Sequence, residues 1–308
     1  MAYKHLFGPV PSRRLGVSLG IDLVPYKTCT LNCVYCECGR TTNLTLERKE
    51  YVPTAEILAE LGDYLKPGPD LDYITFSGSG EPTLHTGVKH IIRFLKMEYP
   101  KYKVAVLTNG TLLYDKGVRE ELMRADLVMP SLDAVSKEAF TRVNRPHRDI
   151  PLGDMMGGLI EFRDEFKGQI WLEIFIVPGL NDGESELRLL KKTVGRIRPD
   201  KVQINTLDRP GTESWVMPAG KAELERIASL LGGEVIASFE SRKKIKSFSR
   251  NIEEDIVSTL GRRPCTAKDL SAILSLHLNE VNKYLQLLLE TGRIYSEEEE
   301  RGVFFRIN

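Results

Sequence analysis

Three cysteines in one short segment are the residues best suited to chemistry. They occur in the run Cys29-Thr-Leu-Asn-Cys33-Val-Tyr-Cys36, so three thiols lie within eight residues. Three thiolates can hold three irons of a [4Fe–4S] cluster. Because such clusters usually have four cysteine ligands, one iron would be left open to a substrate. The spacing therefore predicts an iron–sulfur centre with one exchangeable position.

A zinc site or plain core packing could also account for clustered cysteines. A zinc knuckle would need a fourth close ligand, which Cys38 could supply. The chain has five cysteines, and four of them lie within ten residues. An odd number with this clustering is not typical of a disulfide framework and favours metal or redox chemistry. We expect Cys38 to be a spare thiol and Cys265 to be structural.

A second motif is the glycine-containing run from Phe76 to Thr83, Phe-Ser-Gly-Ser-Gly-Glu-Pro-Thr, which follows a strand-like segment. Glycines at such a place let the backbone approach a ligand closely, although the run alone is an ordinary strand-to-helix turn. Short polar side chains end three further strand-like segments. Each of them taken singly could almost equally be a helix N-cap. They are Thr108 and Asn109, then Ser131 and Asp133, then Asn205.

Taken together, the cysteine run and the glycine turn resemble the radical S-adenosylmethionine (SAM) superfamily. Its signature has three cysteines at this spacing and an aromatic residue before the third, a place that Tyr35 fills. The resemblance implies that SAM chelates the open iron through its amino and carboxylate groups. It implies that one electron from the cluster cleaves SAM to methionine and a 5′-deoxyadenosyl radical, which abstracts hydrogen from a substrate. An external electron donor of the ferredoxin or flavodoxin type would then be a partner.

The resemblance also implies which residues bind SAM. In the family a Gly-Gly-Glu stretch binds the amino group through backbone carbonyls, and short polar residues at strand ends bind the ribose and the carboxylate. Ser79 replaces the first glycine here, as in branches written Gly-x-Gly-Glu-Pro. Asn205 is expected to face the adenine, and no catalytic residue is assigned. The expected SAM-binding residues are Tyr35, Gly78, Gly80, Glu81, Thr108, Asn109, Ser131, Asp133 and Asn205.

A parallel sheet would bring these residues together. Strand-like runs at 17–24, 73–76, 103–107, 127–132, 170–177 and 201–207 alternate with helical patterns at 54–65, 86–98, 115–124, 152–166 and 184–197. Thr54 is the expected N-cap of the first helix. Such alternation predicts right-handed crossovers and an α/β fold. Six units are too few for an eight-fold barrel, so we expect a partial (β/α)6 barrel with the cysteine loop at its carboxyl end, where such folds place active sites.

The segment from Gly8 to Gly16, Gly-Pro-Val-Pro-Ser-Arg-Arg-Leu-Gly, resembles a branch of the superfamily related to the tRNA wyosine synthases. The likeness spans about residues 8–240 and suggests an RNA base as substrate. Arg13 and Arg14 could support the cysteine loop, bind an anionic substrate or simply be solvated. Glu173 interrupts an apolar strand, so it is expected either to contact SAM or substrate or to pair with a core arginine.

The composition changes after about residue 241. We expect a radical SAM barrel at 1–241, a basic linker at 242–250 and a module resembling a winged helix-turn-helix at 251–308. The linker has five Lys or Arg and no acid, so it is either a solvated connection or a phosphate contact. The module has seven Lys or Arg against ten Asp or Glu, a net charge of −3, with four consecutive glutamates at Glu297–Glu300. Phosphate binding needs a basic face, so we expect no duplex DNA. Contact with a protein, or cover over the active site, is the expected role of the module.

The whole chain has 43 basic and 43 acidic residues, so no net charge steers it toward nucleic acid or membrane. No apolar run has the length of a membrane span, and the cytoplasm is the expected location. The favoured function is a radical SAM enzyme with a macromolecular substrate, either RNA or protein. Two alternatives remain: an activase that places a glycyl radical on a partner protein, and a cluster-containing regulator that senses redox state or SAM.

Overall fold

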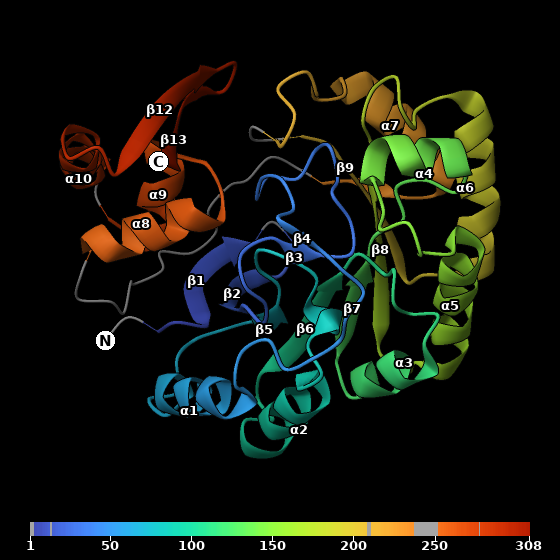
Figure 1. Cartoon of the computed structure of the whole chain (residues 1–308), viewed down its shortest axis with the longest axis horizontal. Coiled ribbons are helices and arrows are strands. Elements are labelled where there is room, and N and C mark those ends of the chain that lie inside the picture. Colours follow the sequence, from blue (N-terminus) through green and yellow to red (C-terminus); the bar gives the residue numbers. More distant parts are fainter. Residues whose placement is uncertain (1–2, 13, 208–210, 237–251, 277) are drawn as a thin grey trace.

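An open, mostly parallel sheet organises the chain. The computed structural model describes residues 3–12, 14–207, 211–236, 252–276 and 278–308. Eight strands form one sheet in the order β1-β2-β5-β6-β7-β8-β9-β10 (Figure 1). Only β1 runs antiparallel to its neighbour; from β2 to β10 every pairing is parallel. This arrangement confirms the α/β class and the partial barrel.

The strand bounds agree with the sequence patterns to within a few residues. The strands of the large sheet are β1 (Leu6–Ser12), β2 (Gly16–Ile21), β5 (Tyr73–Phe76), β6 (Lys103–Thr108), β7 (Leu127–Pro130), β8 (Gln169–Phe175), β9 (Lys201–Asn205) and β10 (Glu234–Val235). Two short strands, β3 (Thr28–Cys29) and β4 (Asn43–Leu44), pair in parallel inside the cysteine loop.

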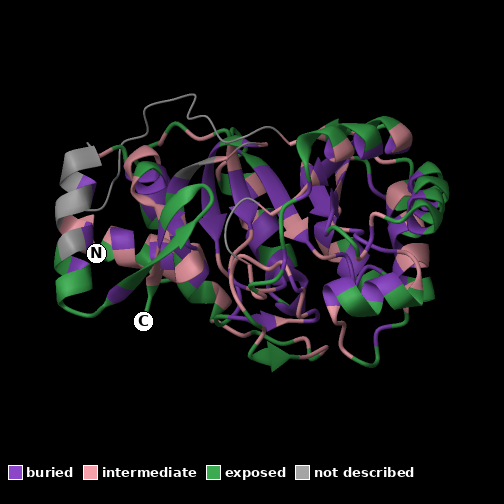
Figure 2. Cartoon of the chain, turned by 90° about the horizontal axis from the view of Figure 1, so that it is seen from above, coloured by how far each residue is buried: buried purple, intermediate pink, exposed green. Residues whose placement is uncertain are grey.

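Helices cover the outer face of the sheet (Figure 1). Their apolar faces pack against alternate strand residues such as Ile74, Val104 and Leu172, which are fully buried. Figure 2 shows this buried layer between exposed helix surfaces. The helices are α1 (Thr54–Leu65), η1 (Pro82–Leu84), α2 (Val88–Glu98), α3 (Lys116–Leu122), α4 (Lys137–Asn144), α5 (Leu152–Glu165), α6 (Glu184–Ile197) and α7 (Lys221–Leu231).

The inner face of the sheet is apolar at its base and polar at its mouth. Leu15, Ala105, Leu127 and Met129 form a small cluster there. Successive side chains on a strand alternate in direction, so the inward residues above this cluster lie at the carboxyl ends of the strands. The fold therefore closes its base with packing and leaves polar groups around its mouth.

Several expectations about the elements need correction or addition. The N-cap of α1 is Pro53, and Thr54 is its first helical residue, whose backbone N–H donates to Glu50. Pro is favoured next to a helix start because it lacks an N–H and has a fixed φ. The sequence patterns also missed α4, α7, β1 and β10, which are short or lack a clean apolar period.

The C-terminal elements follow the expected order. Helices α8 (Ile252–Arg262), α9 (Ala267–Leu274) and α10 (Leu278–Glu290) precede the hairpin of β12 (Ile294–Glu299) and β13 (Gly302–Ile307). A short strand, β11 (Cys265–Thr266), completes a three-stranded antiparallel sheet. Thr266 caps α9 in a capping box with Asp269. The assignment as a winged helix-turn-helix stays a prediction, as do the domain boundaries.

Arg13 and the basic linker at 242–250 lie outside the described residues. Within the described residues, no helix combines the length and apolar character that crossing a membrane would take.

Candidate active site

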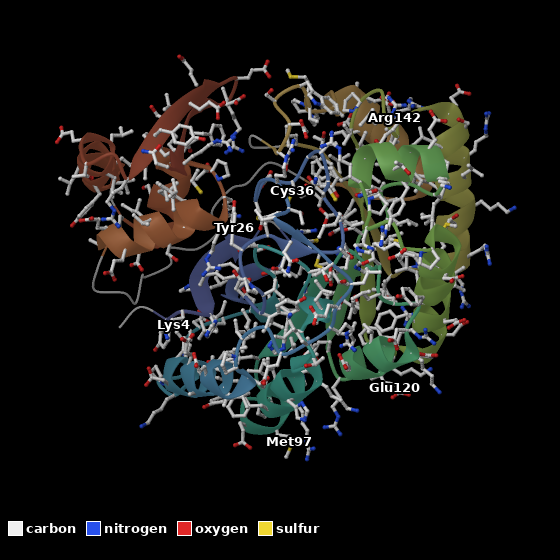
Figure 3. All side chains as sticks on the ribbon, viewed as in Figure 1. Lys4, Tyr26, Cys36, Met97, Glu120 and Arg142 are labelled. Atoms are coloured by element: carbon white, nitrogen blue, oxygen red, sulfur yellow. The ribbon has the colours of Figure 1, made fainter. Side chains whose placement is uncertain are left out.

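The cysteine loop lies at the mouth of the barrel, directly after β2. Figure 3 shows Cys36 on this loop, between the C-terminal elements and α4. The loop is tied to the end of α4, because the backbone N–H of Val34 donates to the carbonyl of Val143 at 3.0 Å. Inside the loop, the N–H of Cys36 donates to the carbonyl of Cys33 at 3.2 Å. Backbone bonds rather than solvent therefore fix the place of the three thiols.

Each of the three sulfurs has its own nitrogen donor. The Lys27 ammonium lies 3.0 Å from Cys36 Sγ. The Asn109 amide nitrogen lies 3.5 Å from Cys29 Sγ, and the Asn144 amide nitrogen lies 3.4 Å from Cys33 Sγ. Donors aimed at sulfur stabilise the anionic thiolate, which is the form that binds iron. This donor set fits a cluster with three cysteine ligands.

The three thiols differ in acidity. Burial raises the pKa of Cys29 to about 11, and it also raises the pKa of Cys33. The hydrogen bond from the Cys38 thiol, together with the nearby Lys27 ammonium, lowers the pKa of Cys36 to about 5. Cys36 is therefore ready to bind a metal at neutral pH, whereas Cys29 and Cys33 need the metal itself to displace their protons.

The arrangement suits several irons better than one ion. Among the residues that the structure describes, no group of three or more His, Cys, Asp or Glu side chains is placed to hold a metal ion. The four ligands of zinc must surround one point, whereas each thiolate of a [4Fe–4S] cluster binds a different iron. Cys38 donates to the Gly78 carbonyl at 3.8 Å as well as to Cys36.

The glycine turn after β5 packs directly on the cysteine loop. A Cβ on Gly80 would lie 2.0 Å from the carbonyl oxygen of Thr28, so only glycine fits this approach. Gly78 has a φ of 145°, and a Cβ there would lie 2.3 Å from Asp22 Oδ1. The Ser79 carbonyl accepts from the N–H of Lys27 at 3.0 Å. The turn and the loop thus form one backbone-to-backbone contact that requires glycine within the protein itself, and the expected approach to a ligand stays a prediction.

Glu81 joins this turn to the end of β6. It is buried, and its Oε1 accepts from the N–H and hydroxyl of Thr83 at 3.0 and 2.6 Å. Oε1 also accepts from the Thr108 hydroxyl at 2.6 Å, while Oε2 accepts from the Asn109 N–H at 2.7 Å. Burial raises the pKa of Glu81, although these hydrogen bonds oppose the shift. The Asn109 side chain in turn donates to Cys29, so Glu81 acts on the loop through Asn109.

Tyr35 anchors the loop to β7 and β8. Its hydroxyl donates to Asp133 Oδ2 at 2.5 Å, and its ring stacks on Phe175 with 3.8 Å between centroids. Asp133 also accepts from the Asn144 amide at 2.6 Å and from the Phe175 N–H at 2.9 Å. Burial raises the pKa of Asp133 to about 6. Both carboxylate oxygens are already bonded, so a contact with SAM at Asp133 would have to displace a protein donor.

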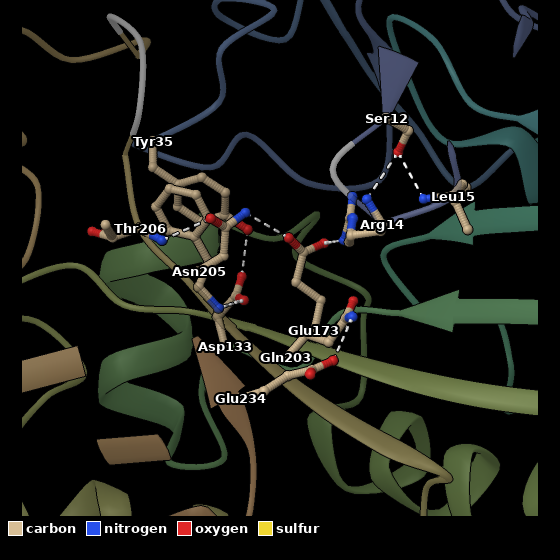
Figure 4. Close-up of polar contacts among 11 residues, drawn as sticks. Ser12, Arg14, Leu15, Tyr35, Asp133, Glu173, Gln203, Asn205, Thr206 and Glu234 are labelled. Carbon is tan, nitrogen blue, oxygen red and sulfur yellow. Dashed lines mark hydrogen bonds and ion pairs between the residues drawn. The ribbon is translucent and has the colours of Figure 1, made fainter. Parts of the chain in front are cut away.

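Arg14, Glu173 and Asn205 meet inside the mouth (Figure 4). Arg14 Nη1 lies 3.1 Å from Glu173 Oε2, and the Asn205 amide donates to Glu173 Oε1 at 2.8 Å. Arg14 is therefore the partner of Glu173, which is the arginine pairing that the sequence left as one of two options. Ser131 bridges to Glu173 through the backbone of β7 and β8.

The C-terminal elements contact the same mouth. Arg262, at the end of α8, forms an ion pair with Asp22 at 2.9 Å, and its guanidinium lies 4.1 Å from the centroid of the Phe7 ring. A cavity of about 430 Å³ lies at this junction, with Arg14, Cys38 and Arg262 among its lining residues. A second cavity of about 580 Å³ lies between residues 211–218 and the β12–β13 hairpin.

The structure thus brings the predicted residues to one end of the sheet. Those linked directly to the loop or turn by hydrogen bonds are Cys29, Cys33, Cys36, Tyr35, Gly78, Glu81, Thr108, Asn109 and Asp133. Ser131 and Asn205 meet at Glu173 on the other side of the mouth. The sequence analysis missed Lys27, Asn144, Phe175 and Asp22. No local motif marks Asn144 and Phe175, which are far from the cysteine run in the chain, and Lys27 is close to the run but belongs to no recognised motif.

Comparisons with known proteins agree with this site. The family model described as the radical SAM superfamily matches residues 23–190. The chain is 30% identical over 315 residues to the UPF0026 protein of Methanocaldococcus jannaschii, covering 98% of this chain and 95% of the relative. It is 38% identical over 298 residues to a protein named GTPase Obg from Brachyspira hyodysenteriae, covering 96% of this chain but only 44% of that protein. The chain therefore spans less than half of the Brachyspira relative.

A solved structure shares the fold. It is a radical SAM methyltransferase from Sphaerobacter thermophilus, with a TM-score of 0.52 and 18% identity. The alignment covers 71% of this chain and 66% of that one. At this identity the likeness supports the partial barrel alone.

Replacing Glu81 by alanine is expected to destabilise the protein by about 3 kcal/mol or more. Four buried donors would lose their acceptor, and each unsatisfied donor costs about 1–3 kcal/mol. Glu120→Ala is the matched control, because Glu120 is exposed and makes only a 3.9 Å pair with Lys116. Urea unfolding followed by circular dichroism measures both. Equal, small changes in the two variants would contradict the role given to Glu81.

Proposed function

Because the chain belongs to the radical SAM superfamily, we propose that it holds a [4Fe–4S] cluster on Cys29, Cys33 and Cys36 and cleaves SAM reductively. One observation carries the proposal: three thiols on one loop, each with a separate nitrogen donor, at the mouth of a partial barrel. When bound, the cluster would supply the electron that splits SAM into methionine and a 5′-deoxyadenosyl radical.

The residues of the chain would position the reactants. Lys27, Asn109 and Asn144 hold the thiolates, and the Tyr35–Asp133 bond fixes the loop on the sheet. The turn from Gly78 to Glu81 would present its backbone to the amino group of SAM. Ser131 and Asn205, on the far side of the mouth, are the proposed contacts of the ribose and adenine. Thr108, Asn109 and Asp133 would act by holding these groups in place, because their side chains are engaged within the protein.

The substrate that receives the radical is proposed to be macromolecular. An RNA base is the first candidate, from the resemblance of the opening segment to the wyosine-related branch. A backbone glycine of a partner protein is the second, as in glycyl-radical activases. The C-terminal elements border both cavities at the mouth, so they are placed to select a large substrate. An external ferredoxin or flavodoxin would supply electrons. The regulator alternative differs in forming no 5′-deoxyadenosine.

Iron content tests the ligand assignment. After anaerobic reconstitution the protein should hold about four irons per chain, and alanine at Cys29, Cys33 or Cys36 should remove most of them, because each thiolate carries one iron. Cys38→Ala and Cys265→Ala are the controls and should keep the iron. A Cys29→Ala protein with full iron beside an iron-free Cys38→Ala protein would show that the assignment is wrong.

SAM cleavage tests the reaction. Protein reduced with dithionite should convert SAM to 5′-deoxyadenosine and methionine, measured by liquid chromatography. A variant with alanine at Cys29, Cys33 and Cys36 should give neither product. Formation of S-adenosylhomocysteine alone would point to polar methyl transfer, and no turnover at all with a loaded cluster would favour the regulator.

Duplex DNA binding tests the C-terminal elements. The full chain should bind duplex DNA only weakly at low salt, because phosphate neutralisation supplies most non-specific affinity and residues 251–308 have a net charge of −3. Gel shifts compare the natural chain with a variant in which Glu297–Glu300 are changed to glutamine. They measure how far these four glutamates weaken DNA binding. If the natural chain binds duplex DNA at sub-micromolar concentration and loses it on adding salt, the result would favour the hypothesis that the protein is a regulator.

A further inference from the structure

Lys27 is a buried lysine with an unusual partner. The residue is 3% exposed, and its ammonium lies 3.0 Å from Cys36 Sγ. Within the described chain, this sulfur is the only hydrogen-bond partner of the ammonium. A buried charge is costly unless it is paired and hydrogen-bonded. When a cluster is bound, the Cys36 thiolate would supply the negative charge that pairs with this ammonium.

The backbone at Lys27 is unusual for a residue with a long side chain. Its φ is 56°, in the left-handed region where glycine is favoured and a long side chain is uncommon. The N–H of Lys27 donates to Ser79, and its carbonyl accepts from the N–H groups of Thr42 and Asn43. Three backbone bonds therefore hold the residue where the cysteine loop meets the glycine turn, with its ammonium beside Cys36.

We propose that Lys27 is a positioning residue whose ammonium, fixed beside Cys36, raises the reduction potential of the cluster. The inference rests on the proposed function, since it requires a cluster on the three cysteines. Reduction adds one negative charge to the cluster. A fixed ammonium beside a cysteine ligand stabilises the reduced form more than the oxidised form. The residue thereby makes the cluster easier to reduce by its electron donor.

The test is a redox titration of the reconstituted protein, followed by the EPR signal of the reduced cluster. Lys27→Met and Lys27→Gln remove the charge, and neither changes the backbone strain, because both carry a β-carbon as lysine does. At a given applied potential their ratio of reduced to oxidised cluster should be about tenfold lower, a shift of about 59 mV for one electron. Lys27→Arg should stay near the natural potential. Lys96→Met is the matched control, because Lys96 pairs with Asp126 at the opposite end of the strands, 2.8 Å away.

The outcomes separate this inference from the proposed function. A natural protein that binds no iron would contradict the proposed function itself. A neutral variant with a full cluster at the natural potential would overturn the role of Lys27. If both neutral variants lose iron while keeping the natural thermal midpoint, retention of iron by Lys27→Arg supports the role of the charge. Loss of iron in Lys27→Arg as well would overturn it.

Discussion

The buried carboxylate of Glu81 is the constraint on which the rest of the site depends. It is buried and accepts four hydrogen bonds, two from Thr83 in the turn after β5 and two from the end of β6. Through the N–H of Asn109 it fixes the amide that reaches Cys29. A parallel sheet brings strand ends to one edge, but it does not fix the side chains there. The hydrogen bonds of Glu81 fix the side chains at that shared edge, and these side chains in turn hold the cysteine loop.

Buried carboxylates at the mouth also make the three thiols unequal. After burial itself, Glu81 is the next cause that raises the pKa of Cys29, and Asp133 has the same effect on Cys33. Cys36 is instead beside Lys27 and the Cys38 thiol. The carboxylates of Glu81 and Asp133, which make the site rigid, therefore disfavour the thiolate forms of Cys29 and Cys33. Bound iron would have to overcome this cost in free energy. The amide nitrogens of Asn109 and Asn144 donate to these two sulfurs and so act in the opposite direction to the carboxylates.

The sequence predicted the fold and located the cysteine loop because both depend on local patterns. Apolar runs located six strands to within a few residues, and cysteine spacing located the loop. The N-cap of the first helix was placed one residue late, at Thr54 instead of Pro53, because a proline cap has no side-chain signal. Asn144 could not be found, since it reaches Cys33 only through the tertiary fold, and Lys27 was overlooked because it belongs to no recognised motif although it is close to the cysteine run. Asp133 was identified as a site residue, but its engagement with Tyr35 was not predictable from spacing.

The C-terminal elements are connected to the cysteine loop by a short path. Arg262 pairs with Asp22 at 2.9 Å, and Asp22 accepts from the Ser79 hydroxyl at 3.0 Å. The Ser79 carbonyl accepts from the N–H of Lys27, whose ammonium reaches Cys36. Each of these groups is at least partly buried, so solvent screens the path weakly. The last part of the chain therefore does more than border the mouth: it supplies the counter-ion of the carboxylate under the glycine turn.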